Sequence, residues 1–169
     1  MTTVEHADKY RAAYSSLIPS GQRVAMHIAM GRSNKEISSE ERLSPSTIKN
    51  KLPDIFRSFE VADRYSLAAR FVQANLLDPK QYMRERGISE VALGVLSDQE
   101  RVYMRTLAGL EEQDGLPIPN SIVAQRTGRK LQSVKNALVI IGGKLSLPDT
   151  SRTTLIMIAL AHKDEMKAA

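Results

Sequence analysis

The stretch "SPSTIKNKLPDIFRSF" (Ser44–Phe59) decides the fold of the first half of this chain. Ser44 can accept a hydrogen bond from the backbone at the start of a helix, and Pro45 fits the first helical turn, where no N–H is needed. Apolar residues then recur at intervals of three and four, which places them on one face of a helix: Ile48, Leu52, Ile55, Phe56 and Phe59. The stretch therefore predicts a helix that buries one side and leaves the other free.

The free side of this helix carries hydrogen-bonding side chains. Lysine can approach guanine acceptors or phosphates in the DNA major groove, and asparagine can pair with adenine. Hydroxyl and free N–H groups in a first helical turn can hold a phosphate. The candidate DNA contacts of this segment are Ser46, Thr47, Lys49, Asn50, Lys51 and Arg57. The alternative is a solvated face of an ordinary helical bundle.

Helical spacing extends over most of the remaining chain and strict alternation is almost absent, which predicts an all-α fold. Ser33 and Glu36 have the spacing of a capping box, so a helix is expected to start at Asn34. Asp63 can cap a further helix. Asp78-Pro79 interrupts the pattern and suggests a boundary. We expect an N-terminal helix and a first module over residues 1–77, a short helical linker over 78–95, and a second module over 96–169.

The second half of the chain repeats the first. A shift of 86 residues takes Thr47-Ile48-Lys49-Asn50 onto Ser133-Val134-Lys135-Asn136, and the apolar stripe recurs as Val134, Leu138, Ile141 and Leu145. Near the start of each copy the shift is 79, from Leu17 to Leu96, so seven residues are inserted around "EEQDGLP" (111–117). This pattern indicates an internal duplication of one four-helix unit.

The first copy resembles the C-terminal helix-turn-helix DNA-binding domain of LuxR-type transcription regulators over residues 17–76. "SNKEI" (Ser33–Ile37) matches the supporting helix of that family. The residues that match its recognition helix and the following turn are Ser44, Thr47, Ile48, Lys49, Asn50, Leu52, Ile55, Phe56, Val61, Asp63 and Arg64. The resemblance implies a tetrahelical module that binds double-stranded DNA and regulates transcription.

The second copy resembles the same family more faintly. "LSDQERVYMRTLAGL" (96–110) fits the opening helix, and Ser133-Val134-Lys135-Asn136 stands for the recognition helix. The resemblance therefore implies two tandem helix-turn-helix modules on one chain. The candidate DNA contacts of the second module are Lys130, Gln132, Ser133, Lys135, Asn136 and Val139.

The first copy departs from the family pattern in the two helices of its motif. Glu41 stands where the family has a core leucine, which suggests that this helix is shorter or shifted. Pro53 lies inside the recognition helix, where it removes a backbone hydrogen bond and costs about 3 kcal/mol. A kink at Pro53 would re-aim Arg57.

The second copy departs in its recognition helix and in the turn that follows. Gly142 and Gly143 lie late in that helix and cost about 1 kcal/mol each relative to alanine. Thr150 stands where the family has an arginine after the aspartate. These departures favour an alternative function, in which the helix-turn-helix scaffold binds RNA polymerase or another regulator and contact with DNA is vestigial.

Composition limits the class of protein. The 169 residues carry a formal net charge of +5 and no cysteine. The charge modestly favours a polyanionic partner, and the lack of cysteine excludes disulfides and thiolate chemistry. "MTTVEHADKYRAAYSSL" (1–17) is no signal peptide, and the longest apolar stretch, "TTLIMIALA" (153–161), is too short to span a bilayer. We expect a cytoplasmic protein.

No pattern of catalytic or metal-binding residues is found. His6, His27 and His162 lack metal-ligand spacing, and "IIGGKLS" (140–146) lacks the flanking residues of a phosphate loop. We expect no enzyme activity, no metal and no cofactor. The apolar "TTLIMIALA" segment predicts either burial within the chain or a homodimer contact, since LuxR-type family members often dimerise through the equivalent last helix.

Overall fold

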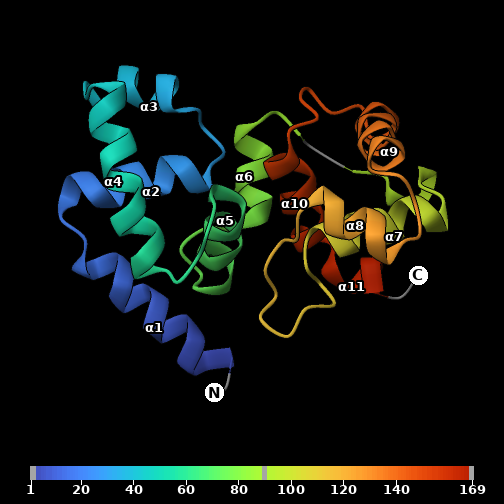
Figure 1. Cartoon of the computed structure of the whole chain (residues 1–169), viewed down its shortest axis with the longest axis horizontal. Coiled ribbons are helices and arrows are strands. Elements are labelled where there is room, and N and C mark those ends of the chain that lie inside the picture. The colour runs from blue at the N-terminus through green and yellow to red at the C-terminus, as the bar shows by residue number, and fades with distance from the viewer. Residues whose placement is uncertain (1–2, 89–90, 168–169) are drawn as a thin grey trace. The chain divides into compact units, whose positions relative to one another are not determined.

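The computed structural model of the chain describes residues 3–88 and 91–167. Throughout these residues the regular structure is helical and contains no strand (Figure 1), so the predicted all-α fold is confirmed. The chain divides into two compact units, which are residues 1–77 (unit 1) and residues 78–169 (unit 2).

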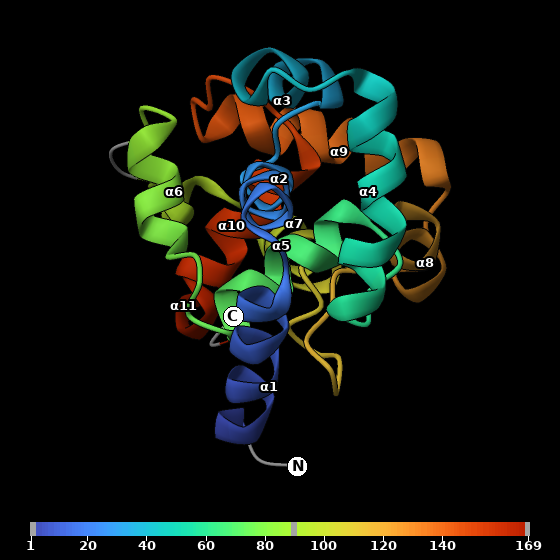
Figure 2. The same cartoon turned by 90° about the vertical axis from the view of Figure 1, so that its left-hand side faces the viewer.

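Unit 1 has an N-terminal helix followed by a group of four. The helices are α1 (Thr3–Ser16), α2 (Pro19–Ala29), α3 (Asn34–Glu41), α4 (Pro45–Ser58) and α5 (Arg64–Gln73). In the group of four, α2 packs against α3, α4 and α5, and α3 packs against α4. Helix α1 packs against α4 and α5, and it lies at the end of unit 1 opposite to α3 (Figures 1 and 2). The central position therefore belongs to α2.

Side-chain caps set the starts of three of these helices. Ser33 and Glu36 form the capping box predicted for α3. The Ser44 hydroxyl accepts a hydrogen bond from Thr47 N at the start of α4, and Asp63 accepts two from backbone N–H groups at the start of α5. Each cap satisfies N–H groups that have no partner within the helix. The helix starts predicted at these positions are confirmed.

The core of unit 1 includes a group of aromatic side chains. Phe59 follows α4, and its ring centroid lies 5.1 Å from that of Phe71 and 6.2 Å from that of Tyr10. Tyr14 meets Phe71 edge-on at 5.6 Å. Tyr10 and Phe59 are both buried. Because such ring pairs combine burial with a preferred geometry, they fix α1 to α4 and α5.

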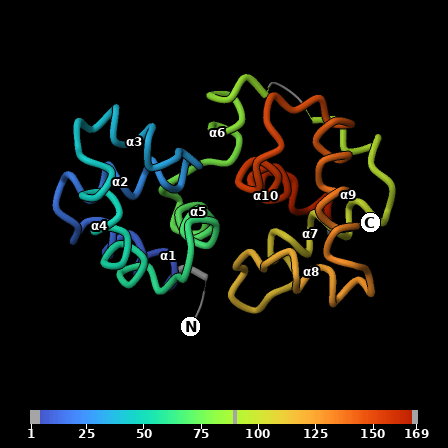
Figure 3. Tube along the Cα trace, turned by 45° about the horizontal axis from the view of Figure 1, so that its top comes forward, coloured from blue at the N-terminus to red at the C-terminus, as the bar shows by residue number. Residues whose placement is uncertain are grey.

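Unit 2 holds the remaining helices and one short 3₁₀ turn. They are α6 (Pro79–Glu85), η1 (Leu93–Val95), α7 (Asp98–Leu107), α8 (Asn120–Arg126), α9 (Leu131–Lys144), α10 (Arg152–Ala161) and α11 (Lys163–Lys167). Helix α7 packs against α8, α9 and α10, and α8 packs against α9. The connection from α7 to α8 forms the extended loop visible in Figure 3, at the place of the predicted insertion.

The helix bounds of the two units repeat. A shift of 86 residues takes the bounds of α4 onto those of α9, and the first residue of α3 onto the first residue of α8. For α5 and α10 the shift is 88. The packing repeats as well, because α2 contacts α3, α4 and α5 as α7 contacts α8, α9 and α10.

Thr150 follows Asp149 as the sequence analysis noted, but the later start of α10 brings another arginine, Arg152, to the place that Arg64 has in unit 1. Arg64, the first residue of α5, donates to the Arg32 carbonyl at 3.0 Å. Arg152, the first residue of α10, donates to the Ile118 carbonyl at 2.5 Å. Arg32 and Ile118 are 86 residues apart, and each lies two residues before the following helix. The arginine is therefore present, displaced from position 150 because α10 starts later.

The segment predicted as a linker is built into unit 2. Helix α6 packs along α10, and Tyr82 is fully buried with its hydroxyl 3.0 Å from Thr154 Oγ1. Arg86 pairs with Asp149 at 3.3 Å. Residues 89 and 90 of this segment lie outside the described residues. The structure differs here from the predicted linker because α6 contributes a buried side to the core of unit 2.

The apolar segment near the C-terminus is covered within unit 2. Residues 153–159 of α10 are all buried, and α10 packs against α6, α7 and α11. A helix that is apolar all round is expected where neighbours cover every side. Burial within the chain accounts for the composition of this segment. No helix within residues 3–88 and 91–167 has the length and apolar content needed to cross a membrane.

The two neighbouring glycines of α9 have different surroundings, so replacing each with alanine should change the free energy of unfolding in opposite directions. A Cβ on Gly142 would overlap the Thr150 side chain, whereas a Cβ on Gly143 would have no atom within 4 Å. We expect Gly142→Ala to destabilise unit 2 by about 1–2 kcal/mol through overpacking. We expect Gly143→Ala to stabilise it by up to about 1 kcal/mol, since alanine is the better helix former. Urea unfolding followed by circular dichroism measures both, and effects of the same sign would contradict this account.

Candidate nucleic-acid interface

Helices α3 and α4 are joined by a tight turn. The turn comprises residues 42–44, and Arg42 adopts a left-handed backbone conformation with φ of 53°. The Ser38 hydroxyl, on α3, donates to the Leu43 carbonyl at 2.6 Å. Since Ser44 also caps α4, the backbone is fixed on both sides of the turn. The start of α4 is thereby held at a defined place relative to α3.

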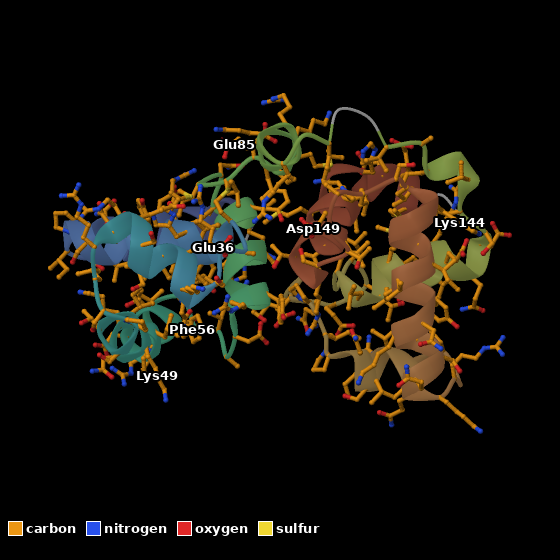
Figure 4. All side chains as sticks on the ribbon, turned by 90° about the horizontal axis from the view of Figure 1, so that it is seen from above. Glu36, Lys49, Phe56, Glu85, Lys144 and Asp149 are labelled. Carbon is orange, nitrogen blue, oxygen red and sulfur yellow. The ribbon has the colours of Figure 1, made fainter. Side chains whose placement is uncertain are left out.

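Helix α4 separates a buried face from an outward face, as predicted. Ile48 is 0% and Ile55 is 2% exposed. Lys49 and Asn50 are exposed, and the side chain of neither makes a hydrogen bond or ion pair with another described residue. Figure 4, in which Lys49 is labelled, shows this part of α4 at the outer edge of unit 1. The two side chains that suit base edges are therefore free to meet a ligand.

The first turn of α4 presents three connected hydroxyl groups. Ser44 Oγ lies 2.7 Å from Ser46 Oγ and 2.8 Å from Thr47 Oγ1. Thr47 N donates to Ser44 Oγ at 3.0 Å. Ser46 is exposed and Thr47 is half-buried. Hydroxyls at a helix start, beside N–H groups that point along the helix axis, are suited to holding a phosphate oxygen.

Two predicted contacts of α4 are already engaged within the protein. Lys51 is half-buried, and its Nζ lies 3.3 Å from Ser20 Oγ, so this side chain lies on the flank that faces α2. Arg57 forms an ion pair with Asp54 at 2.9 Å, and both side chains are exposed. Exposed ion pairs of this kind are weak, so Arg57 can exchange Asp54 for a phosphate. Lys51 is less accessible than its position in the sequence suggests.

Pro53 does not end α4, which runs as one helix from Pro45 to Ser58. The proline is exposed on the outward side. A proline there removes the hydrogen bond to the Lys49 carbonyl, and the carbonyl stays beside solvent. Arg57 thus lies on the same helix as Lys49.

In unit 2 the predicted contacts all lie on the exposed side of α9 or just before it. These residues are Lys130, Gln132, Ser133, Lys135, Asn136 and Val139. Gln132 Nε2 donates to Asn136 Oδ1 at 2.8 Å, so the Asn136 amide is partly engaged whereas that of Asn50 is free. The start of α9 has no side-chain cap, because Lys130 occupies the position that Ser44 has in unit 1.

Two exposed residues of unit 2 were missed by the sequence comparison. Arg129 lies in the turn before α9, and Ile140 lies on α9 with 54% of its surface exposed. Ile140 lies two positions after the buried Leu138, so helical spacing places it outside the buried apolar stripe. An apolar residue outside that stripe is the sequence signal that predicts its exposure. Arg129 carries no such signal.

Charged side chains hold α3 against α2. The Arg23 Nε atom lies 2.6 Å from Glu41 Oε2, and His27 Nε2 lies 3.0 Å from Glu41 Oε1. His27 Nδ1 is 3.4 Å from Glu40, which also pairs with Arg32. The hydrogen bond from Arg23 lowers the pKa of the Glu41 carboxyl, with a further contribution from His27. Glu41 is the last residue of α3, so an ionic contact stands where the LuxR-type pattern has an apolar one.

Among residues 3–88 and 91–167, no group of three or more His, Asp or Glu side chains is placed to hold a metal ion. Compared with known protein families, with curated proteins and with solved structures, the chain gives no match. The resemblance to LuxR-type regulators therefore stays a prediction from the residues themselves.

The contact between Glu41 and Arg23 should make unit 1 sensitive to acid. The pKa of Glu41 in the folded chain is lower than its ordinary value of 4.5. The Glu41–Arg23 contact therefore stabilises folded unit 1 fully at pH values above 4.5. This stabilisation is lost as the pH falls through the lower pKa that Glu41 has in the folded chain. We expect Glu41→Gln to lower the Tm of unit 1 by about 3 °C at neutral pH. The difference from wild type should shrink as the pH falls below 4.5 and vanish once Glu41 is protonated in the folded chain.

Thermal unfolding at a series of pH values measures this difference. Glu85→Gln, which removes an exposed carboxylate of unit 2, is the control and should leave the Tm of unit 1 unchanged at every pH. A Glu41→Gln effect that is constant from neutral to acid pH would contradict the ionic origin.

Proposed function

We propose that this chain binds double-stranded DNA in a sequence-specific manner and regulates transcription, with α4 as the helix that reads the sequence. The observation that carries the proposal is the outward face of α4, on which Lys49 and Asn50 are exposed and unengaged. Helix α4 follows α3 after a three-residue turn. Two helices joined by such a turn are typical of the helix-turn-helix motif, whose second helix enters the major groove.

Each group on the outward face has a role in this proposal. Asn50 pairs with an adenine edge, and Lys49 approaches guanine acceptors or a phosphate. Ser46 and Thr47, together with the first N–H groups of α4, hold a phosphate and so fix the register of the helix on the duplex. Arg57 reaches a second phosphate after release from Asp54.

Unit 2 adds cations to the same proposal. Lys130, just before α9, and Lys135, on α9, are exposed, and neither forms an ion pair with a described residue. Since both units belong to one chain, a single molecule could engage two half-sites. With a net charge of +5, few phosphates are neutralised, so affinity should depend moderately on salt.

A second candidate function rests on α9. Val139 and Ile140 are 61% and 54% exposed, and apolar side chains on an outward helix face are typical of protein interfaces rather than of phosphate contacts. In this candidate function, unit 2 binds RNA polymerase or another regulator. It is compatible with reading of DNA by unit 1.

Replacement of the two base-reading side chains tests the proposed function. A binding site is first selected from random duplex DNA with the full chain. We expect Lys49→Ala with Asn50→Ala to weaken binding to that site by about 100-fold, since each good base contact contributes about 1–3 kcal/mol of discrimination. Gel shift measures the loss. The helical circular dichroism should be unchanged, because both side chains are exposed.

Lys80→Ala is the matched control, since Lys80 is an exposed lysine of α6 outside either outward face. It should leave specific binding unchanged. Lys49→Ala alone should also reduce the dependence of affinity on salt by about one released ion. Full specific binding by the double variant would reject α4 as the reading helix.

A further inference from the structure

The second half of the outward face differs between α4 and α9. In α4 this part carries Pro53, Asp54 and Arg57, so it is polar and charged. The positions 86 residues later carry Val139, Ile140 and Gly143, and all three are exposed. The buried faces of the two helices stay apolar, with Ile48 and Val134 both fully buried. Both inner sides are thus apolar, although Phe56 and Phe59 correspond to Gly142 and Leu145. The outward sides differ in kind, since one is charged and the other is apolar.

Gly143 has no role inside unit 2. An added Cβ at Gly143 would meet no atom within 4 Å, whereas at Gly142 it would overlap Thr150. Glycine lowers the stability of a helix interior, and Gly142 is explained by the close approach of Thr150. Gly143 lies one turn beyond Val139 and next to Ile140 on the exposed surface, so a flat, apolar spot results. Such a spot lets another backbone approach closely.

Every charged residue of α9 and of the turn before it is basic. Helix α9 contains no aspartate or glutamate between Leu131 and Lys144. Arg129, Lys130 and Lys135 are exposed and form no ion pair within the described part of the chain. Lys144 is engaged by Glu100 at 2.8 Å. A partner that covers Val139 and Ile140 therefore meets free cations toward the start of α9.

We propose that the outward face of α9 binds an acidic amphipathic helix of another protein. Apolar side chains of the partner pack on Val139 and Ile140, its backbone approaches at Gly143, and its carboxylates pair with Lys130 and Lys135. Helix recognition of this kind combines an apolar ridge with flanking charge complementarity. This surface is separate from the DNA contacts proposed for α4, so it stands whether or not α4 reads DNA. Because it uses Lys130 and Lys135, it takes the place of a second DNA half-site on unit 2.

Two other occupants fit less well. A second copy of α9 would bring cations against cations, because α9 has no carboxylate to meet them. A DNA duplex satisfies Lys130 and Lys135, but its major groove offers Val139 and Ile140 only thymine methyl groups among polar edges. At position 143 the glycine also removes the cation that Arg57 provides at the corresponding place in α4.

Selection of peptides tests the proposal. A phage-displayed library of helix-forming peptides with randomised surface positions is selected on the purified full chain. We expect the recovered peptides to carry apolar residues at intervals of three and four, flanked by more Asp and Glu than the starting library. Fluorescence anisotropy with a recovered peptide then gives its affinity. We expect Gly143→Arg to weaken binding by about tenfold or more, and Val139→Ala with Ile140→Ala to do the same.

The controls separate this surface from a folding defect. Gly143→Arg introduces the residue that α4 has at this position and removes a poor helix former, so the Tm should not fall. Arg57→Ala, on α4, should leave peptide affinity unchanged. The proposal would be overturned if no peptides were recovered, or if the recovered peptides were not enriched in Asp and Glu. It would also be overturned if Gly143→Arg and the Val139→Ala, Ile140→Ala variant bound the peptide as tightly as wild type.

Two further results would assign the surface to another occupant and also overturn the proposal. In sedimentation, a wild-type dimer that Gly143→Arg converts to monomer would identify a second copy. Reduced retention of random duplex DNA by the Val139→Ala and Ile140→Ala variant, with peptide binding intact, would identify DNA.

Discussion

The burial of one face of α4 is the constraint on which the rest of unit 1 depends. Ile48 and Ile55 are buried, and Phe59, just beyond the helix, joins the aromatic group that includes Tyr10 and Phe71. Because a helix turns by about 100° per residue, burying these positions forces Lys49 and Asn50 outward. The side chains available to a ligand are thus determined by the side chains that the core requires.

The same constraint acts on α9 in unit 2. Comparison of α4 with α9 therefore separates the residues that the fold requires from those that are free to differ. The bounds of α9, shifted by 86, match those of α4. The starts of α5 and α10 are each fixed by an arginine that donates to a carbonyl just before α3 or α8, respectively. With the inner contacts kept, the outward residues are free to change without loss of the fold. The inner faces differ in size, since Phe56 and Phe59 correspond to Gly142 and Leu145, but both are apolar. The outward faces differ in chemical character, which is what a change of partner would produce.

The helix starts could be predicted from the sequence because they depend on local hydrogen bonds. Side-chain contacts between distant helices could not be predicted, because they depend on the tertiary structure. Ser33, Ser44 and Asp63 cap helices through hydrogen bonds within three residues of themselves, so sequence spacing is sufficient to find them. Arg152 was missed because its partner is the distant Ile118 carbonyl, and a two-residue difference in the preceding turn moved it out of alignment. Lys51 is regularly spaced with its neighbours, yet its contact with Ser20 depends on where α2 lies. Exposure of the candidate site could be predicted, but the engagement of individual side chains could not.

Gly142 and Gly143 show that neighbouring residues of one type can have different structural reasons. Both are expected to weaken α9, and the sequence offers no reason to treat them differently. Thr150 occupies the space beside Gly142, whereas the space beside Gly143 is open. Packing inside unit 2 therefore explains Gly142 and leaves Gly143 without an internal reason. The proposed partner helix supplies one, because its backbone would approach at Gly143 beside the exposed Val139 and Ile140.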